Sequence, residues 1–338
     1  MISRDSYMGS EPIDAVVTWV DGADPRHQLK RRLAMQPCGD ASSNWIPAGA
    51  APTRFADNNE VEFCLRLIRK FAPWIRTIFL VTDEQRPAFL TAEEQGRLGV
   101  ELIDHSQIFE GYEAILPTFN SLTIESVLYR IPGLAERFIY FNDDVFLLRH
   151  VDPEDFFIGD RVVLRGEWRR LPKFGPARLA VSSALNVIAK RVFGIDRAMS
   201  VLQQIRAAQL AGMRETFFKV VHTPHPMRRE TLRRFWDKNP RELARNIRYK
   251  FRNLDQVATT GLANHLEIQA SNVDLRSPND AMMVCFHRES KDVIAKKLEA
   301  LSGRRVKYFC VQSLDQASPF QKERVAESLR WATEEGDD

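Results

Sequence analysis

Residues 138–148 read FIYFNDDVFLL, a stretch that places two neighbouring carboxylates and an asparagine inside an apolar run. Residues 138–141 are aromatic and β-branched, which predicts a buried strand that runs directly into Asn142. Asp143 and Asp144 follow at once. Adjacent carboxylates that lose hydration repel each other, and a divalent cation removes that cost. We therefore interpret Asp143 and Asp144 as ligands of Mg²⁺ or Mn²⁺, with a solvated Asn-Asp turn as the alternative.

The sequence on both sides of this stretch alternates between strand and helix patterns. We expect strands at residues 13–20, 78–82, 100–103 and 138–141, and helices at residues 59–71, 88–98 and 121–130. This alternation predicts an α/β fold with a mostly parallel sheet and helices on both faces. Ligands of such sheets bind beyond the carboxyl ends of the strands. The polar residues that follow the strands should therefore meet at one edge.

The second half of the chain reads as mostly helical. We expect helices at residues 179–212, 228–248 and 318–334, a loop at 220–226 and a strand at 306–311. These patterns divide the chain into three predicted parts. The parts are an α/β core at 1–160, a basic helical insert at 161–215, and a C-terminal part at 216–338 that completes the active site.

Positive charge is concentrated in the middle of the chain. The 338 residues carry a formal net charge of only +3, but residues 161–252 contain 22 Lys and Arg against 6 Asp and Glu. Such a segment attracts anions, whether a nucleotide, an acidic polymer or an anionic membrane, although any single Arg is also at home on a solvated helix face. Few aromatic residues are interleaved with the charges, so we expect no nucleic acid partner.

Targeting and cysteine patterns point to a cytoplasmic protein. Residues 1–12 lack the apolar centre of a secretory signal, and no apolar run approaches the roughly 20 residues of a membrane span. The four cysteines form no C-x-x-C pair, which argues against a zinc site or a disulfide framework. We expect the basic segment to hold the protein at the inner face of a membrane.

Two further residues suggest chemistry, each weakly when taken alone. His222 lies in a polar stretch and could transfer a proton near neutral pH, although such histidines are often uneventful surface residues. Arg252 could clamp a phosphate group with two hydrogen bonds.

Several longer stretches of the sequence form four blocks. The first block is IDAVVTWVDGADP at 13–25. The second comprises RFADNNEVEFCLRLIRKFAPWIRTIFLVTDEQRPAFL at 54–90 and LPTFNSLTIESVLYRIPGLAERFIYFNDDVFLLRHVDPEDFF at 116–157. The third comprises FFKVVHTPHPMRRETLRRF at 217–235 and YKFRNLDQ at 249–256, and the fourth is VKYFCVQSLDQ at 306–316. Together these blocks resemble the Stealth family of sugar-phosphate transferases, the fourth more faintly than the others.

The resemblance implies a GT-A-like domain that binds a nucleotide-sugar, expected to be a UDP-sugar, with Mg²⁺ or Mn²⁺. An acceptor hydroxyl of a capsular or extracellular polysaccharide would attack the sugar-bearing phosphorus, and UMP would leave. Motif positions assign His222, Arg252 and Asp144 to catalysis and Asp143 with Asp144 to the metal. The residues implied in donor binding are Asp14, Trp19, Asp21, Gly22, Arg54, Asp57, Asn58, Asn120, Ser121 and Asn142.

The fourth block departs from the family pattern. Family members usually carry Asn-Asp at the positions where this chain has Gln312 and Ser313, so the role of that Asp would pass to a neighbour such as Asp315 or be missing. Two other functions stay open on the residues alone. One is a metal-dependent glycosyltransferase that forms glycosidic bonds, and the other is a polyanion-binding protein.

Overall fold

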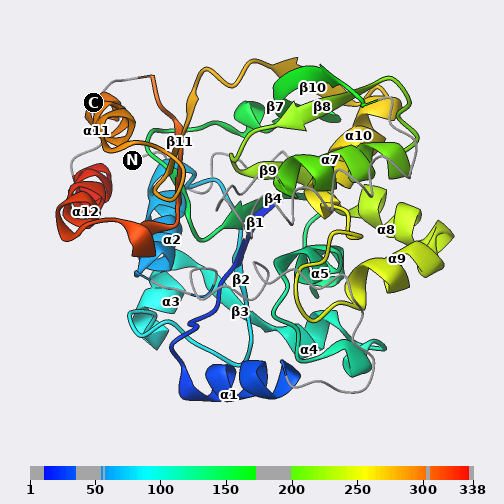
Figure 1. The fold of residues 1–338 in the computed structure, drawn as a ribbon, viewed down its shortest axis with the longest axis horizontal. Coiled ribbons are helices and arrows are strands. Elements are labelled where there is room, and N and C mark those ends of the chain that lie inside the picture. Colours follow the sequence, from blue (N-terminus) through cyan, green and yellow to red (C-terminus); the bar gives the residue numbers. More distant parts are fainter. Residues whose placement is uncertain (1–10, 36–54, 56–57, 173–198, 302–304, 335–338) are drawn as a thin grey trace.

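The computed structural model describes residues 11–35, 55, 58–172, 199–301 and 305–334. Its central sheet has the strand order β3-β2-β1-β4-β9 (Figure 1). The first four of these strands are parallel to one another, and β9 is antiparallel to β4. The predicted α/β class with a mostly parallel sheet is therefore confirmed. The strands are β1 Ile13–Thr18, β2 Ile78–Thr82, β3 Val100–Asp104, β4 Arg137–Asn142 and β9 His225–Arg228.

Helices cover both faces of this sheet, as the alternating pattern predicts (Figure 1). Because strand side chains alternate between faces, Ala15 and Val17 enter one core and Val16 enters the other. The first core contains the apolar stripe of α2 Glu60–Phe71, in which Leu65 is fully buried. Burial of one such leucine contributes about 1.5–3 kcal/mol. The second core is closed by α5 Ser121–Glu125, α8 Arg229–Lys238 and α9 Pro240–Ile247.

Two predicted helices are shorter than the sequence pattern suggests. The helix expected at 121–130 ends at Glu125, and a short 3₁₀ turn, η5 Leu128–Arg130, follows it. The helix expected at 228–248 is divided into α8 and α9 at Pro240, whose ring lacks the N–H that a continuous helix requires.

A second small sheet lies beside the acidic turn. Its strands are β5 Val145–Leu147, β11 Ala281–Cys285 and β12 Tyr308–Gln312, in the order β11-β12-β5. β12 runs antiparallel to β5 with Cys310 opposite Val145. The Val311 N–H donates to the Asp144 carbonyl at 3.0 Å. The fourth sequence block is thereby placed next to the acidic turn of the second.

The third sheet corrects the predicted helical insert at 161–215. Its first ten residues form the strand β7 Arg161–Arg170, which pairs with β10 Val273–Arg276, β6 Phe157–Ile158 and β8 Thr216–Val220. The buried run from Val162 to Gly166 explains the strand, because it leaves no helical stripe. Of the expected helix at 179–212, residues 179–198 lie outside the described residues, and α7 Met199–Leu210 is helical. The three-part division stays a prediction.

The loop expected at 220–226 is also shorter than predicted, because His225 begins β9. The closing helix is confirmed as α12. The described helices contain none long and apolar enough to cross a membrane. The remaining elements are α1 Pro25–Ala34, α3 Ala92–Leu98, α4 His105–Ile108, η4 Glu113–Ile115, η6 Pro153–Asp155, α10 Thr259–Gln269, α11 Lys291–Ala300, η7 Leu314–Gln316 and α12 Pro319–Glu334.

Candidate functional site

The acidic turn connects β4 to β5 at the carboxyl end of a central strand, and neighbouring groups hold it firmly. The Tyr140 hydroxyl donates to Asn142 Oδ1 at 2.7 Å and lies 3.0 Å from the Thr18 hydroxyl. The Cys64 thiol donates to the Asn142 carbonyl at 3.8 Å. Asn142, Asp143 and Asp144 themselves are partly exposed. The turn therefore presents its carboxylates from a fixed backbone.

The carboxylate of Asp144 is in an unfavourable position without a cation. Its Oδ1 is buried and makes no hydrogen bond among the described residues. Burial and the nearby Glu60 charge raise the pKa of Asp144 to about 7, and the Arg252 charge opposes this shift. A carboxylate whose ionised form is destabilised in this way gains from a bound cation.

This donor set fits a hard divalent cation. In the part of the chain that the structure describes, no group of three or more His, Cys, Asp or Glu side chains forms a ready metal cage. Mg²⁺ commonly takes only one or two protein carboxylates and completes its shell with water and substrate phosphates. Asp143 and Asp144 would hold such an ion, and the buried Oδ1 of Asp144 supports the assignment.

Glu60 is an additional carboxylate at this edge that the sequence patterns did not single out. It opens α2, its side chain is buried, and it accepts hydrogen bonds from the Asn58 backbone N–H at 2.5 Å and the Asn58 amide at 3.1 Å. The Asn58 amide oxygen in turn accepts from Lys322 at 3.1 Å. Asn58, which we predicted to bind the donor, is thus engaged in holding Glu60. In the sequence, the one signal for Glu60 is its position two residues after Asn58, inside the second block.

Arg252 joins the third sequence block to the second. Its guanidinium donates to the Ser121 hydroxyl at 2.5 Å. Burial has the largest influence on the pKa values of Asp144, Glu125 and His222, and the Arg252 charge acts on all three. The Arg252 charge therefore links the Ser121 end of α5 electrostatically with His222 and with Asp144 of the acidic turn.

Glu125 is the second carboxylate that sequence reasoning missed. It lies one helical turn after Ser121 on α5 and is 7% exposed. Burial raises the pKa of Glu125 to about 7, while the Arg252 charge and a hydrogen bond from Ser121 act in the opposite direction. The available signal in the sequence was that Glu125 is the single acidic residue of the helix predicted at 121–130. A carboxyl group with this pKa is suited to proton transfer near neutral pH.

His222 lies in the connection between β8 and β9, on the same side as Arg252. Burial and the positive charges of Arg252, Arg288 and Lys219 lower the pKa of His222 below its ordinary value of 6.5. The imidazole is therefore neutral at pH 7 and able to accept a proton.

Asn120 makes hydrogen bonds inside the protein instead of facing the site edge. It is fully buried, and its amide donates to the Tyr249 carbonyl at 3.0 Å and to Gln256 Oε1 at 2.8 Å. These bonds fasten residues 249–256, which carry Arg252, to the start of α5. Its position favours alignment of Arg252 over the predicted contact with a donor.

Asp14 lies away from the other predicted residues. It is fully buried near the amino end of β1, where its carboxylate accepts from Arg76 at 2.6 and 2.9 Å and from the Ala135 N–H at 2.7 Å. The acidic turn follows the opposite, carboxyl end of the parallel strand β4. This placement does not support the prediction that Asp14 binds the donor.

The end of β1 reaches the predicted edge. Trp19 is buried there, and the main chain of Asp21 exchanges two hydrogen bonds of 2.9 Å with the Gln85 side chain. Gly22 passes so close to Phe55 that a Cβ atom at this position would lie 2.1 Å from the Phe55 carbonyl oxygen. Glycine is therefore required by close approach at this turn. Arg54 and Asp57 lie outside the described residues.

The altered fourth block borders the acidic turn. By the antiparallel register, Gln312 continues β12 past the residue opposite Asp144. Ser313 follows with a left-handed backbone, φ 58°, and its hydroxyl lies 2.9 Å from His287 Nδ1. Where the resemblance implies a carboxylate, this chain has a hydroxyl next to an imidazole. Arg288, the next residue after His287, also acts on His222.

Many charges of the basic segment are compensated within the protein. Arg165 pairs with Asp155 and Asp280, and Glu230 pairs with both Arg233 and Arg234. Further ion pairs join Arg169 to Glu167, Arg206 to Asp255, Arg228 to Glu136 and Arg245 to Glu242. The count of 22 basic and 6 acidic residues already includes Glu167, Glu230 and Glu242. The pairs with Asp155, Asp280, Asp255 and Glu136, which lie outside the segment, reduce its positive field further and weaken the case for a polyanion-binding protein.

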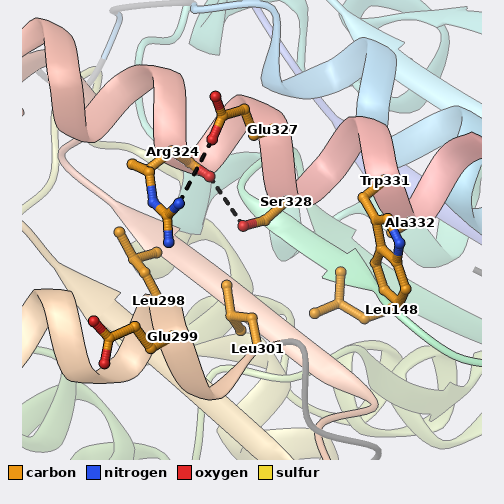
Figure 2. Close-up of a pocket in the computed structure, with 9 residues that line it drawn as sticks. All are labelled: Leu148, Leu298, Glu299, Leu301, Arg324, Glu327, Ser328, Trp331 and Ala332. Carbon is orange, nitrogen blue, oxygen red and sulfur yellow. Dashed lines mark hydrogen bonds and ion pairs between the residues drawn. The ribbon is translucent and has the colours of Figure 1, made fainter.

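A separate pocket of about 260 Å³ lies between α11 and α12 against the end of β5 (Figure 2). Leucine side chains and Trp331 make its apolar part, and Arg324 pairs with Glu327 at its rim. None of the predicted site residues lines it.

Comparisons with known proteins identify two conserved regions. Residues 11–36 match the model described as Stealth protein CR1, conserved region 1, and residues 54–163 match Stealth protein CR2, conserved region 2.

Curated relatives carry phosphotransferase names. Exopolysaccharide phosphotransferase SCO2592 of Streptomyces coelicolor is 34% identical over 75% of this chain and 25% of the relative. Exopolysaccharide phosphotransferase SCO6021 of the same organism is 30% identical over 89% of this chain and 51% of the relative. A capsular polysaccharide phosphotransferase of Neisseria meningitidis serogroup B is 42% identical over 45% of this chain and 39% of the relative. The chain spans from a quarter to about half of these relatives' lengths.

Among solved structures, the galactosyltransferase LgtC in complex with donor and acceptor sugar analogs matches 94% of this chain and 95% of its own. The identity is 12% and the TM-score 0.44. The strand order and the parallel register of the central sheet establish the α/β fold of this chain.

Proposed function

The chain belongs to the Stealth family, and from this premise we propose that it moves hexose 1-phosphate from a UDP-sugar to a hydroxyl of a growing capsular or extracellular polysaccharide, with release of UMP. One observation carries the proposal. The acidic turn, Arg252 and His222 come from distant parts of the chain, yet one charge, that of Arg252, acts on the other two. Phosphoryl transfer needs this combination of charge neutralisation, positioning and a proton acceptor.

Donor binding is assigned to the edge formed by β1, β4 and α5. Asp143 and Asp144 would hold Mg²⁺ or Mn²⁺, which when bound neutralises charge on the diphosphate and stabilises the departing UMP. Arg252, oriented by the Ser121 hydroxyl, faces the same edge and can clamp phosphate oxygens. We assign Trp19, Asp21 and Gly22, which follow β1, to the wall of the nucleotide site.

The proton of the acceptor hydroxyl is assigned to His222. The acceptor oxygen forms a bond to the sugar-bearing phosphorus, the bond from that phosphorus to UMP breaks, and the hydroxyl proton passes to the neutral imidazole. The lowered pKa of His222 keeps it in the accepting form at neutral pH. Glu125 orients Ser121 and Arg252 in this scheme, and its raised pKa makes it the second candidate for the proton.

Nucleotide analysis tests the proposal. The protein is incubated with Mg²⁺, a panel of UDP-sugars and a polysaccharide acceptor, and the released nucleotides are separated. Donor-dependent UMP supports sugar-phosphate transfer. UDP as the sole nucleotide product would mean a glycosyltransferase instead, because acidic strand ends that hold a cation serve both reactions.

We further propose that the transfer reaction takes place at the inner face of a membrane, where a cytoplasmic nucleotide-sugar and an exported polymer meet. The compensated charges at 161–252 offer less support for this than the sequence suggested. A different element, α1, carries a more suitable surface.

A further inference from the structure

The helix α1 has two chemically different faces. Its inner face packs on the body of the protein, where His27 is buried and contacts the ring of Phe119 at a centroid distance of 5.2 Å. Arg31 also turns inward, with its guanidinium 4.3 Å from the centre of the Phe55 ring. Lys30 pairs with Asp83 at 3.1 Å.

The outer face of α1 combines leucine and arginine. Leu29 is 50% exposed, Leu33 is 56% exposed, and the two lie four residues apart, one helical turn above the other. Arg26 and Arg32 are exposed on the same side. Of the eight large apolar side chains that the described residues leave exposed, three belong to α1 and its C-cap Met35.

We propose that this outer face of α1 docks on an anionic lipid surface. A helix that presents leucines between arginines can bury its apolar side chains at the boundary of headgroups and acyl chains, while the guanidinium groups reach the phosphates. The helix residues Pro25–Ala34 contain four basic and no acidic side chains. Lys30 and Arg31 make contacts within the protein, with Asp83 and Phe55, so Arg26 and Arg32 remain to contact lipid headgroups.

Acidic groups near α1 do not cancel this surface. Glu84, the most exposed of them, is paired with Lys30 at 2.8 Å. Asp24 caps the helix start, where its carboxylate accepts from the His27 N–H at 2.8 Å. The exposed charges beside the two leucines, those of Arg26 and Arg32, are therefore positive, which favours an anionic membrane over a neutral one.

The position of α1 connects docking to the candidate site. In Figure 1 the helix lies at the lower edge of the molecule. Its inner face contacts Asp83, which follows the carboxyl end of β2, and the Phe119 ring, which stacks on Phe251 beside Arg252 at 5.4 Å. Docking through α1 would hold the edge that carries Arg252 close to the lipid surface. Vesicle binding itself does not depend on the proposed reaction.

Flotation of the full chain with lipid vesicles tests the proposal without donor or acceptor. Vesicles of phosphatidylcholine alone are compared with vesicles that also contain phosphatidylglycerol. We expect the unaltered protein to bind the anionic vesicles. Leu29→Ser/Leu33→Ser should reduce this binding about tenfold or more, because serine removes the exposed apolar surface that each leucine would bury in the lipid. Arg26→Gln/Arg32→Gln should lower binding to the anionic vesicles about tenfold and make the residual binding insensitive to salt.

The matched control is Leu275→Ser/Val293→Ser, which removes two apolar side chains of 40% and 42% exposure from β10 and α11. It should bind as the unaltered protein does. Unchanged thermal unfolding of all three variants shows that each is folded. Absence of binding to anionic vesicles, or equal binding by the Leu29→Ser/Leu33→Ser variant, overturns the proposal. So does an equal loss in the control, because the effect would then not belong to α1.

Discussion

Replacement of Glu125 by glutamine should change how stability depends on pH. The pKa of Glu125 is about 7 in the folded protein against an ordinary value of 4.5, chiefly because the side chain is buried. A raised carboxyl pKa means that the folded state binds its proton more tightly than the unfolded state. The stabilising contribution is therefore complete below about pH 4.5, declines as pH rises through 7, and is lost above it.

The size of this effect follows from the shift. A difference of about 2.5 pKa units at 1.36 kcal/mol per unit corresponds to about 3 kcal/mol. Because Glu125 is 7% exposed, solvent screening reduces this little. Glutamine at this position cannot ionise, so the unfolding free energy of the unaltered protein minus that of Glu125→Gln should fall by about 3 kcal/mol between pH 4.5 and pH 8.

Urea unfolding of both proteins across this pH range measures the difference. Glu230→Gln is a useful control, because hydrogen bonds from Arg233 and Arg234 lower the pKa of Glu230 to about 2. Its contribution should instead be present above the ordinary pKa and decline as pH falls. A difference for Glu125→Gln that does not vary with pH would show that the carboxyl group ionises normally, and the interpretation of Glu125 as a poised acid-base group would be wrong.

Four further substitutions separate catalytic from structural roles. Asp143→Ala and Asp144→Ala should each abolish turnover, while the temperature of thermal unfolding changes by no more than a few degrees. Asp160 is exposed, and the control Asp160→Ala should keep full activity. Near-normal rates in Asp143→Ala or Asp144→Ala would show that the turn does not hold the metal. His222→Ala should lower kcat by about 10²–10⁴ and leave donor affinity nearly unchanged by calorimetry, whereas a loss of donor binding alone would contradict its role as proton acceptor. Asp14→Asn should destabilise the protein by about 2 kcal/mol, because it weakens the bonds to Arg76, yet leave the rate per folded molecule intact. A selective loss of donor binding would restore Asp14 to the site.

The central sheet could be predicted because its strands end in turn residues and are separated by helices. Residues 78–82 and 100–103 are short apolar runs of this kind. The strand β7 was missed because its arginines, read along the sequence, look like a charged helix face, whereas pairing with β8 and β10 decides its conformation. Tertiary pairing of this kind is not encoded in local periodicity.

The candidate site was predictable where residues follow strand ends, and less so where burial decides the role. Asp144 follows a strand end, and the Arg252 charge acts on it. Asp14 belongs to the same sequence block as Asp21, but a position at the start of the strand gives it an ion pair with Arg76 instead. Glu125 was missed because a single glutamate in a helix is normally solvated, and only the packed structure shows that it is buried.

The fate of the donor's β-phosphate tests the central claim most directly. A UDP-sugar labelled with ³²P at the phosphate next to the sugar is supplied with acceptor and Mg²⁺, and the polymer is separated from nucleotides. Transfer of hexose 1-phosphate at the acidic turn predicts label in the polymer, unlabelled UMP in solution, and neither product with Asp144→Ala. Label recovered entirely in UDP, with unlabelled sugar in the polymer, would contradict the account.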